Sequence, residues 1–344
     1  MKIIVCNSKT PFVKGGSEIV VEWLLQELKK RQIEVEELSI PLLWKKEEDA
    51  IRCYLTWRLL NLEESLEIPP HLIICTKFPS YVIQHHNKVI WLFHQFRQVY
   101  DWVGTELGYA CDTVLQLDVR KKIMEIDDLS FKEAKKIFAI SKNVANRLLK
   151  FNNVKAEVIY PFPPNKDDYY CSNYGNYFLH VGRLEKNKRV DLIIEAFKNS
   201  STTKKLIITG EGSNKGLLQE KVERYNLGER VKFVGWVDKK QLLELYANAY
   251  AVIFAAHDED FGLVMPEAFL SRKALITLTD SGGVTELVKD NETGLLATPD
   301  IEAFSYTINR ACLERNRIIE MGNNAYEIVN SWSWDNIIEK LISI

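Results

Sequence analysis

The feature that most constrains the fold is an order of strand, glycine loop and helix that occurs twice. Ile3–Cys6 is a short apolar strand, and Gly15-Gly16 precede an amphipathic run over residues 18–31. The same order starts again with the apolar strand Tyr177–Gly182. Strands that alternate with helices are typical of α/β domains built on a parallel sheet. We therefore expect an α/β chain with one such unit in each of two halves.

The two halves are separated by a proline-rich segment. Val158–Pro164, VIYPFPP, has three prolines in seven residues, a composition typical of a linker. The 344 residues are enough for two domains of ordinary size. We predict a first domain over residues 1–163, a second domain over residues 164–330, and a final helical segment over residues 331–344.

The stretch His257–Ala268, HDEDFGLVMPEA, is the strongest candidate for a ligand site. It follows an apolar run, Tyr250–Ala256, with the length and composition of a buried parallel strand. Pro266 indicates the first position of a helix, and the preceding Met265 has no side-chain oxygen to cap it. An anionic ligand could therefore accept hydrogen bonds from the free amides at this helix start.

Two carboxylates, Glu259 and Glu267, lie eight positions apart in this stretch, with Gly262 between them. Carboxylate oxygens accept hydrogen bonds from ligand hydroxyls. We expect Glu267, near the helix start, to hold hydroxyls of the anionic ligand and Glu259 to hold another part of it. Considered alone, the loop fits two solvated surface acids equally well.

A second group of candidates lies in HVGRLEKNKRVDLIIEAF. Gly182, Arg183 and Lys188 surround the start of a helix predicted over Asp191–Phe197. Two cations beside a helix N-terminus suit a diphosphate, because each charged hydrogen bond contributes about 1.5–3 kcal/mol. An exposed arginine and lysine beside a turn are also often simply solvated, so this pattern alone leaves both interpretations open.

The first half offers two further candidates. Gly15-Gly16 lie just before a helix, where bare backbone can approach a phosphate, although they could also serve only to form a turn. The strand predicted within Lys88–Gln95 ends at His94. The carboxyl ends of parallel strands are where open α/β sheets place ligand contacts. A lone histidine is also often a structural residue.

Together these motifs resemble those of retaining nucleotide-sugar glycosyltransferases of family 4, which have the GT-B fold. The resemblance rests on Glu259-x7-Glu267 with Phe261-Gly262 inside it, and on the arginine–lysine string before the helix. It spans nearly the whole chain and is densest over residues 177–296. It implies two Rossmann-like domains whose parallel sheets face a cleft, and a terminal helix that packs back on the first domain.

The resemblance also implies roles for individual residues. The arginine and lysine grip the donor diphosphate, Glu267 holds the ribose hydroxyls, and Glu259 contacts the donor sugar. His94 lies beside that sugar, and backbone groups around Val237 read the base. The catalytic set implied is His94, Arg183, Lys188 and Glu259. The remaining donor contacts implied are Gly15, Gly16, Gly182, Phe261, Gly262, Leu263 and Val264.

One position departs from a pattern found in some relatives of this kind. They carry a second histidine two positions after the first, where this chain has Phe96. We therefore carry over a role for His94 alone. The residues that follow are expected to shape the acceptor side: Arg97, Tyr100, Asp101 and Trp102.

We predict a retaining, metal-independent enzyme that moves a hexose from a nucleotide-diphosphate sugar to a hydroxyl of a glycan or lipid-linked acceptor. A UDP-sugar is favoured over GDP-mannose, and no further cofactor is expected. Four alternatives stay open: a metal-dependent transferase using Asp258-Glu259-Asp260, a catalytically silent nucleotide-binding module, a glycosidase working through Glu259 and Glu267, and a sugar-nucleotide epimerase. The glycine run at 210–216 does not fit a dinucleotide fingerprint.

Composition places the chain among ordinary soluble proteins, with 46% hydrophobic and 27% charged residues. The six cysteines are scattered, so we expect reduced and mostly buried thiols. The first apolar run is too short for a signal peptide, and no run approaches the roughly 20 residues that span a bilayer. We expect a cytoplasmic protein with no nucleic-acid partner, and contact with the inner face of the cell membrane is left open.

Overall fold

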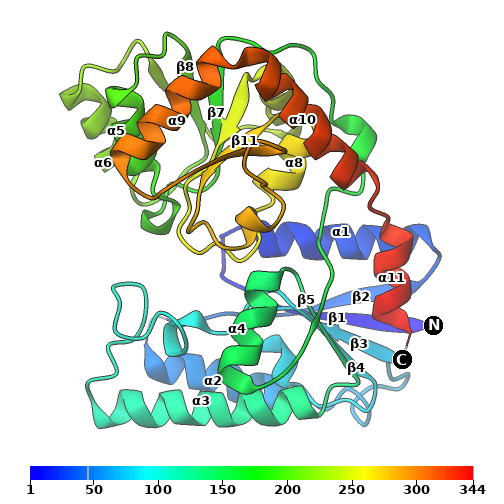
Figure 1. The fold of residues 1–344 in the computed structure, drawn as a ribbon. Helices are drawn as coiled ribbons and strands as arrows, with labels where there is room; N and C mark the ends of the chain where they lie inside the picture. The colour runs from blue at the N-terminus through cyan, green and yellow to red at the C-terminus, as the bar shows by residue number, and fades with distance from the viewer. Residues whose placement is uncertain (45, 344) are drawn as a thin grey trace. The chain divides into compact units, whose positions relative to one another are not determined.

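The computed structural model describes residues 1–44 and 46–343 (Figure 1). The chain divides into two compact units. The first comprises Met1–Pro161 and Ser333–Ile344, and the second comprises Phe162–Trp332. Each unit contains one six-stranded parallel sheet with helices around it, which confirms the predicted α/β class.

In the first unit the strand order is β2-β1-β3-β4-β5-β6. In Figure 1, α1 lies on one face of this sheet and α2 and α3 lie on the other. The strands are β1 (Lys2–Lys9), β2 (Glu34–Pro41), β3 (Leu72–Cys75), β4 (Lys88–Leu92), β5 (Lys136–Ala139) and β6 (Glu157–Val158). The α-helices are α1 (Gly16–Lys30), α2 (Glu47–Leu59), α3 (Val114–Lys132), α4 (Lys142–Asn152) and α11 (Trp334–Ile342), with short 3₁₀ turns η1 (Ser80–Val82) and η2 (Arg97–Val99).

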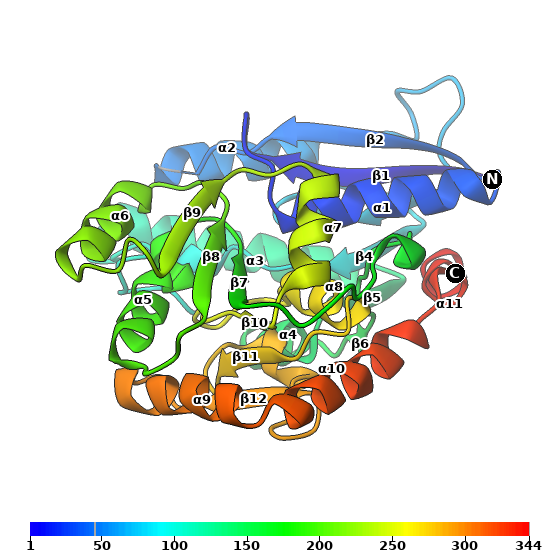
Figure 2. The ribbon, with the colours of Figure 1, turned by 90° about the horizontal axis from the view of Figure 1, so that it is seen from above.

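In the second unit the strand order is β12-β11-β10-β7-β8-β9. Figure 2 shows α9 and α10 following one another along one side of this sheet. The strands are β7 (Tyr177–Val181), β8 (Lys205–Thr209), β9 (Val231–Gly235), β10 (Ala251–Ile253), β11 (Leu275–Leu278) and β12 (Gly294–Ala297). The helices are α5 (Val190–Asn199), α6 (Lys215–Arg224), α7 (Lys239–Asn248), α8 (Val264–Leu270), α9 (Ile301–Leu313) and α10 (Arg315–Asn330), with 3₁₀ turns η3 (Lys166–Asp168), η4 (Lys186–Lys188) and η5 (Gly283–Glu286).

Burial of apolar side chains on both faces of the central strands explains why these segments form parallel sheets. Every residue of β3 (LIIC), β4 (KVIWL) and β11 (LITL) is buried. Each fully buried large apolar side chain contributes about 1.5–3 kcal/mol. Because all strands of a parallel sheet end at the same edge, the loops that carry the predicted site residues gather at one edge of each sheet.

The terminal helix α11 belongs to the first unit. Trp334 packs edge-on against Trp91 of β4, with ring centroids 6.3 Å apart. Asp335 accepts a hydrogen bond of 2.5 Å from Arg31, the C-cap residue that follows α1. Within the described part of the chain, no helix combines the length and apolar character needed to cross a membrane.

Candidate functional site

In the second unit, a loop joins β7 to η4 and α5 and carries the predicted cations. Arg183 is exposed, and its side chain makes no hydrogen bond or ion pair with any residue that the structure describes. Gly210 is required beside this loop, because a Cβ there would lie 2.0 Å from the carbonyl oxygen of Gly182. The loop therefore packs closely against its neighbour and presents one guanidinium to solvent.

Lys188, at the end of η4, is buried and forms an ion pair with the Glu259 carboxylate. Its ammonium also lies 5.7 Å from the centre of the Phe254 ring. The structure thus brings together two of the predicted residues from segments 71 positions apart. Because each charge neutralises the other, the pair can stay buried without a ligand.

Backbone hydrogen bonds hold the Glu259 loop against the two neighbouring loops. The carbonyl of Glu259 accepts from Gly283 N at 2.8 Å, and His257 N donates to Asn187 O at 2.9 Å. Gly262 has φ +84°, and a Cβ at this position would lie 2.7 Å from Val284. This conformation requires glycine, which explains the Phe-Gly pair inside the loop.

Arg189 is a residue of this region that the sequence analysis did not select. Its guanidinium donates to both carboxylate oxygens of Asp280, at 2.6 and 2.8 Å, and to Ala255 O at 2.7 Å. It therefore ties the start of α5 to the loops after β10 and β11. Two features of the sequence could have identified Arg189: it directly follows Lys188, and an aspartate, Asp280, lies after the β11 strand. The left-handed backbone at Arg189, φ +47°, has no sequence signal in an arginine.

The structure corrects the predicted start of the helix after this loop. α8 begins at Val264 rather than at Pro266, which is its third residue, because Leu263 already has helical backbone angles. Met265 is inside the helix and its amide donates to Gly262 O at 3.0 Å. Among the described residues, none accepts a hydrogen bond from the amides of Leu263 and Val264.

Glu267 is the fourth residue of α8, and two tyrosines hold its carboxylate. The Tyr246 hydroxyl donates to Oε2 at 2.8 Å, and the Tyr169 hydroxyl donates to Oε1 at 3.4 Å. Burial of the carboxyl group raises the pKa of Glu267 to about 7, although both hydroxyl bonds act to lower it. A partly protonated carboxyl group near neutral pH is not the freely solvated surface acid of the alternative interpretation.

Val237, predicted to lie under a base, is half-buried in the turn between β9 and α7. The next residue, Asp238, caps α7 by accepting from Gln241 N at 2.8 Å, and Asp238 N donates to Gln241 Oε1 at 3.1 Å. This capping box fixes the turn. Trp236, on the other side of Val237, is exposed.

In the first unit, Gly15 caps α1 and Gly16 is its first residue. Glu18 accepts from Gly15 N at 2.8 Å and forms an ion pair of 2.6 Å with Lys77 from the loop after β3. The Glu18 and Lys77 side chains are only 10% and 7% exposed. Burial acts to raise the pKa of Glu18, but the Lys77 ammonium and the Gly15 amide hold it below its usual value.

His94 lies beyond its strand, since β4 ends at Leu92 and not at His94 as predicted. Phe93, the first residue after β4, donates its amide to Thr76 O at 3.1 Å. The Nδ1 atom of His94 lies 2.9 Å from Gln95 O, so this nitrogen carries the proton, because a carbonyl only accepts. Its ring packs edge-on against Phe78, with centroids 5.2 Å apart.

Several residues after His94 are buried and contact other side chains of the first unit. Phe96 is buried and stacks on Phe78 with centroids 4.5 Å apart, which accounts for an apolar side chain at this position. Arg97 is buried between Asp101, at 2.5 Å, and the Trp102 ring, at 4.2 Å. Tyr100 is buried as well, and its hydroxyl donates to Asp127 in the core at 2.8 Å. Two of the four residues expected to shape the acceptor side, Arg97 and Tyr100, therefore have partners inside the first unit.

The triplet Asp258-Glu259-Asp260 does not converge on a metal position. Within residues 1–44 and 46–343, one set of three or more histidine, cysteine, aspartate or glutamate residues has ligand atoms within 4.8 Å of one another, and it is Glu63, His85 and His86. In His85, Nδ1 accepts from a backbone amide at 3.0 Å and Nε2 lies 3.2 Å from a backbone carbonyl. Both ring nitrogens are engaged, so this second group does not fit a metal in its present arrangement.

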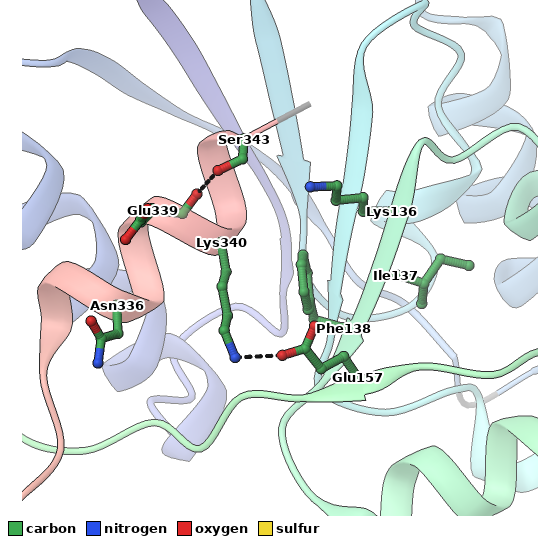
Figure 3. A pocket seen from close by; sticks show the side chains of 8 residues that line it. All are labelled: Lys136, Ile137, Phe138, Glu157, Asn336, Glu339, Lys340 and Ser343. Atoms are coloured by element: carbon green, nitrogen blue, oxygen red, sulfur yellow. Dashed lines mark hydrogen bonds and ion pairs between the residues drawn. The ribbon is translucent and has the colours of Figure 1, made fainter.

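A groove of about 520 Å³ lies in the first unit between α11 and the β5–β6 edge of the sheet (Figure 3). Its lining residues are Lys136, Ile137, Phe138, Glu157, Asn336, Glu339, Lys340 and Ser343. An ion pair between Lys340 and Glu157 crosses it and ties α11 to the sheet edge. None of the predicted site residues contributes to this groove.

The predicted site residues fall into two groups. Gly15, Gly16 and His94 lie in the first unit, at the carboxyl edge of its sheet. All the others lie in the second unit, where the structure joins Lys188 to Glu259 and supports Glu267 with two tyrosines.

Comparisons with known proteins point to one enzyme family. The family model described as glycosyl transferases group 1 matches residues 171–328. An uncharacterized glycosyltransferase of Methanocaldococcus jannaschii is 24% identical over 320 residues, covering 85% of this chain and 80% of the relative. A glycogen synthase of Mycobacterium tuberculosis is 35% identical over 124 residues. That match spans 35% of this chain and only 30% of the synthase.

Solved structures match over both units. Sucrose-phosphate synthase from Thermosynechococcus elongatus superposes with a TM-score of 0.79 at 19% identity, covering 98% of this chain and 96% of that one. Anabaena HepE in complex with UDP and glucose superposes with a TM-score of 0.73 at 17% identity, covering all of both chains. These matches show the fold, which is the two-domain GT-B fold.

Proposed function

We propose that this group 1 glycosyltransferase moves a hexose from a nucleotide-diphosphate sugar to a hydroxyl of a glycan or lipid-linked acceptor. In this proposal the transfer retains the configuration at the anomeric carbon and needs no metal ion. The observation that carries this proposal is the charge arrangement before α5. Arg183 is exposed without a partner among the described residues, and Lys188 is already linked to Glu259.

That arrangement suits the leaving group of such a reaction. When the bond between the anomeric carbon and the diphosphate oxygen breaks, negative charge develops on the diphosphate. The Lys188 ammonium is held in place by Glu259, and a cation positioned before the charge appears stabilises it more strongly than mobile water does. The exposed Arg183 guanidinium can add a charged hydrogen bond once the diphosphate is bound. Lys188 also fixes Glu259 through their ion pair. If Lys188 binds the diphosphate, Glu259 lies close to the sugar attached to that diphosphate, which supports its proposed contact with the donor sugar.

Retention requires the acceptor hydroxyl to attack from the face that the diphosphate leaves. In the proposed step, the acceptor oxygen forms a bond to the anomeric carbon while the bond to the diphosphate breaks. The acceptor proton passes to an oxygen of the departing diphosphate, so no protein carboxylate forms a covalent intermediate. His94 is proposed to contact the donor sugar, with its Nδ1 proton held by Gln95 O.

For the donor we propose a UDP-sugar rather than GDP-mannose. HepE, which shares the fold over its full length and was solved with UDP and glucose, supports this choice. Glu267 would hold the ribose hydroxyls, and backbone groups near Val237 would contact the base.

The second candidate is a metal-dependent transferase that uses Asp258-Glu259-Asp260. A run of three acids is the observation in its favour. Against it, the middle acid is paired with Lys188 and the three do not converge. If transfer activity is lost in EDTA and returns with Mg²⁺ or Mn²⁺, the metal-dependent reading is correct; activity that persists in EDTA supports the proposal.

A thermal-shift panel of UDP, GDP, ADP and their sugar derivatives tests the proposed function. A ligand present at about 100 times its dissociation constant should add about 2.7 kcal/mol of stability, enough to rank the candidates. A sugar-transfer assay with the best donor then separates transfer from hydrolysis. Binding of none of these nucleotides, or release of free sugar with every acceptor tried, would reject a transferase of this kind.

A further inference from the structure

The Glu267 carboxylate is oriented from three separate elements. Tyr246 lies on α7 and Tyr169 follows η3, whereas Glu267 itself lies on α8. Each carboxylate oxygen accepts one hydroxyl bond, at 2.8 Å from Tyr246 and 3.4 Å from Tyr169. An ionised carboxylate accepts about four hydrogen bonds, so about one acceptor position remains on each oxygen.

The two tyrosines hold this group rigidly. Tyr246 is fully buried, and the rings of Tyr246 and Tyr169 pack at 6.4 Å between centroids. A buried phenol ring loses its freedom on folding, so its hydroxyl stays in one place. A bond to each oxygen fixes the plane of the carboxylate, whereas a bond to one oxygen would leave the carboxylate free to rotate.

We propose that Tyr246, assisted by Tyr169, is a positioning residue that aims the Glu267 carboxylate at the two adjacent hydroxyls of the donor ribose. This inference rests on the proposed function. A vicinal diol presents two donors at a fixed separation, and a carboxylate with one open acceptor position on each oxygen matches it. Tyr246 acts through Glu267 and need not touch the nucleotide.

The ionisation of Glu267 makes nucleotide affinity depend on pH, and this dependence is a second way to test the role of Tyr246. The groups that act on its carboxyl are the two tyrosines, and burial raises its pKa to about 7 while their bonds lower it. The ionised form is the one that accepts from ribose hydroxyls, so affinity should rise as pH increases through that value. Loss of the Tyr246 bond removes support for the ionised form, so the rise should move to higher pH.

The test is calorimetric titration of the full chain with UDP and GDP, each also as its 2′-deoxy form, at pH values from 7 to 9. This range lies above the titration of the terminal phosphate, near pH 6. The variants are Tyr246→Phe, Glu267→Gln and, as a matched control, Tyr177→Phe. Tyr177 donates its hydroxyl to the carbonyl of Leu245, the residue before Tyr246, at 2.8 Å, and not to Glu267.

We expect Tyr246→Phe to weaken binding of the ribonucleotide about 2- to 10-fold at pH 7, the effect of one lost hydrogen bond. The loss should shrink toward pH 9. Removal of the 2′-hydroxyl should weaken binding to the native chain but cost the Tyr246→Phe variant less, because coupled contacts are not additive. Tyr177→Phe should bind like the native chain.

Three results would overturn the inference. If Glu267→Gln weakens binding and Tyr246→Phe does not, the tyrosine has no positioning role, and the proposed function stands. If Tyr246→Phe weakens the ribo and 2′-deoxy forms equally, the change acts on folding rather than on the diol. If the native chain binds neither UDP nor GDP, the proposed function fails first and the inference fails with it.

Discussion

Two loops in this molecule follow a parallel strand and open a helix, one in each unit, and they treat charge differently. In the first unit, the buried Lys77 neutralises Glu18, an acid of the first turn of α1. In the second unit, Lys188 is also paired, but Arg183 is exposed and has no partner among the described residues. The same local order therefore builds a structural contact in one unit and leaves a cation available in the other.

The contrast assigns different consequences to the two sets of charges. Breaking a buried ion pair leaves one uncompensated charge inside the protein, which lowers stability. Removing a solvated arginine leaves nothing buried, so its loss should appear in ligand binding or turnover. Four substitutions can break or sharpen this contrast.

Arg183→Ala should have the largest effect. We expect kcat/KM for transfer from the donor sugar to fall about 100- to 1000-fold, equal to about 2.7–4 kcal/mol, because one charged donor to the developing negative charge is lost. The melting temperature should not change. Arg317→Ala, which removes an exposed arginine of α10, is the control. A drop in melting temperature with unchanged kcat/KM would reverse the assignment.

Lys77→Met should lower the stability of the first unit by about 3 kcal/mol, because Glu18 is left buried without its partner. Thermal unfolding measures the change. Lys14→Met removes a solvated partner of Glu22 from the loop before α1 and should cost less than about 1 kcal/mol. Equal losses for the two variants would show that burial of the Glu18–Lys77 pair has no energetic consequence.

Asp127→Asn should change how stability depends on pH. Burial raises the pKa of Asp127 to about 7, above its usual 3.8, although bonds from Tyr100 and Tyr54 lower it. A raised carboxyl pKa gives stability that is present below the unfolded pKa and lost as pH rises through the folded one. The free energy of unfolding of the native chain should therefore fall by about 1–3 kcal/mol between pH 4 and pH 8. The variant should not show this decrease.

Thermal unfolding at several pH values follows this difference. Asp118→Asn, an exposed acid on the same helix α3, is the control and should keep the native slope. An identical slope in the native chain and in Asp127→Asn would mean that Asp127 titrates alike in the folded and unfolded states.

Arg189→Ala should have the smallest effect. The side chain ties three loops through Asp280 and Ala255, and both ends of the ion pair are partly exposed, at 20% and 30%. We expect KM for the donor to rise about fivefold, equal to about 1 kcal/mol, with little change in kcat. Arg189→Lys should recover part of the loss. A large fall in kcat at constant KM would instead place Arg189 in contact with the reacting groups.

Much of the fold was readable from the residues because it depends on local pattern. Apolar runs such as those of β3 and β11, and the glycine loops before α1 and α5, predict an α/β chain without any tertiary information. Family motifs added the enzyme class. Ends of elements were less accurate: backbone angles at Leu263 start α8 two residues before Pro266, and β4 stops two residues before His94.

The sequence by itself determined which residues are candidates for the chemistry, because an arginine, a lysine and two carboxylates stand at the spacing of a family motif. Only the tertiary structure decided how each is held. Lys188 meets Glu259 from 71 positions away, Arg189 reaches Asp280, and two tyrosines from other elements take the Glu267 carboxylate. The physical reason is that a charge's behaviour depends on its burial and its partners, and both are set by elements brought together when the chain packs.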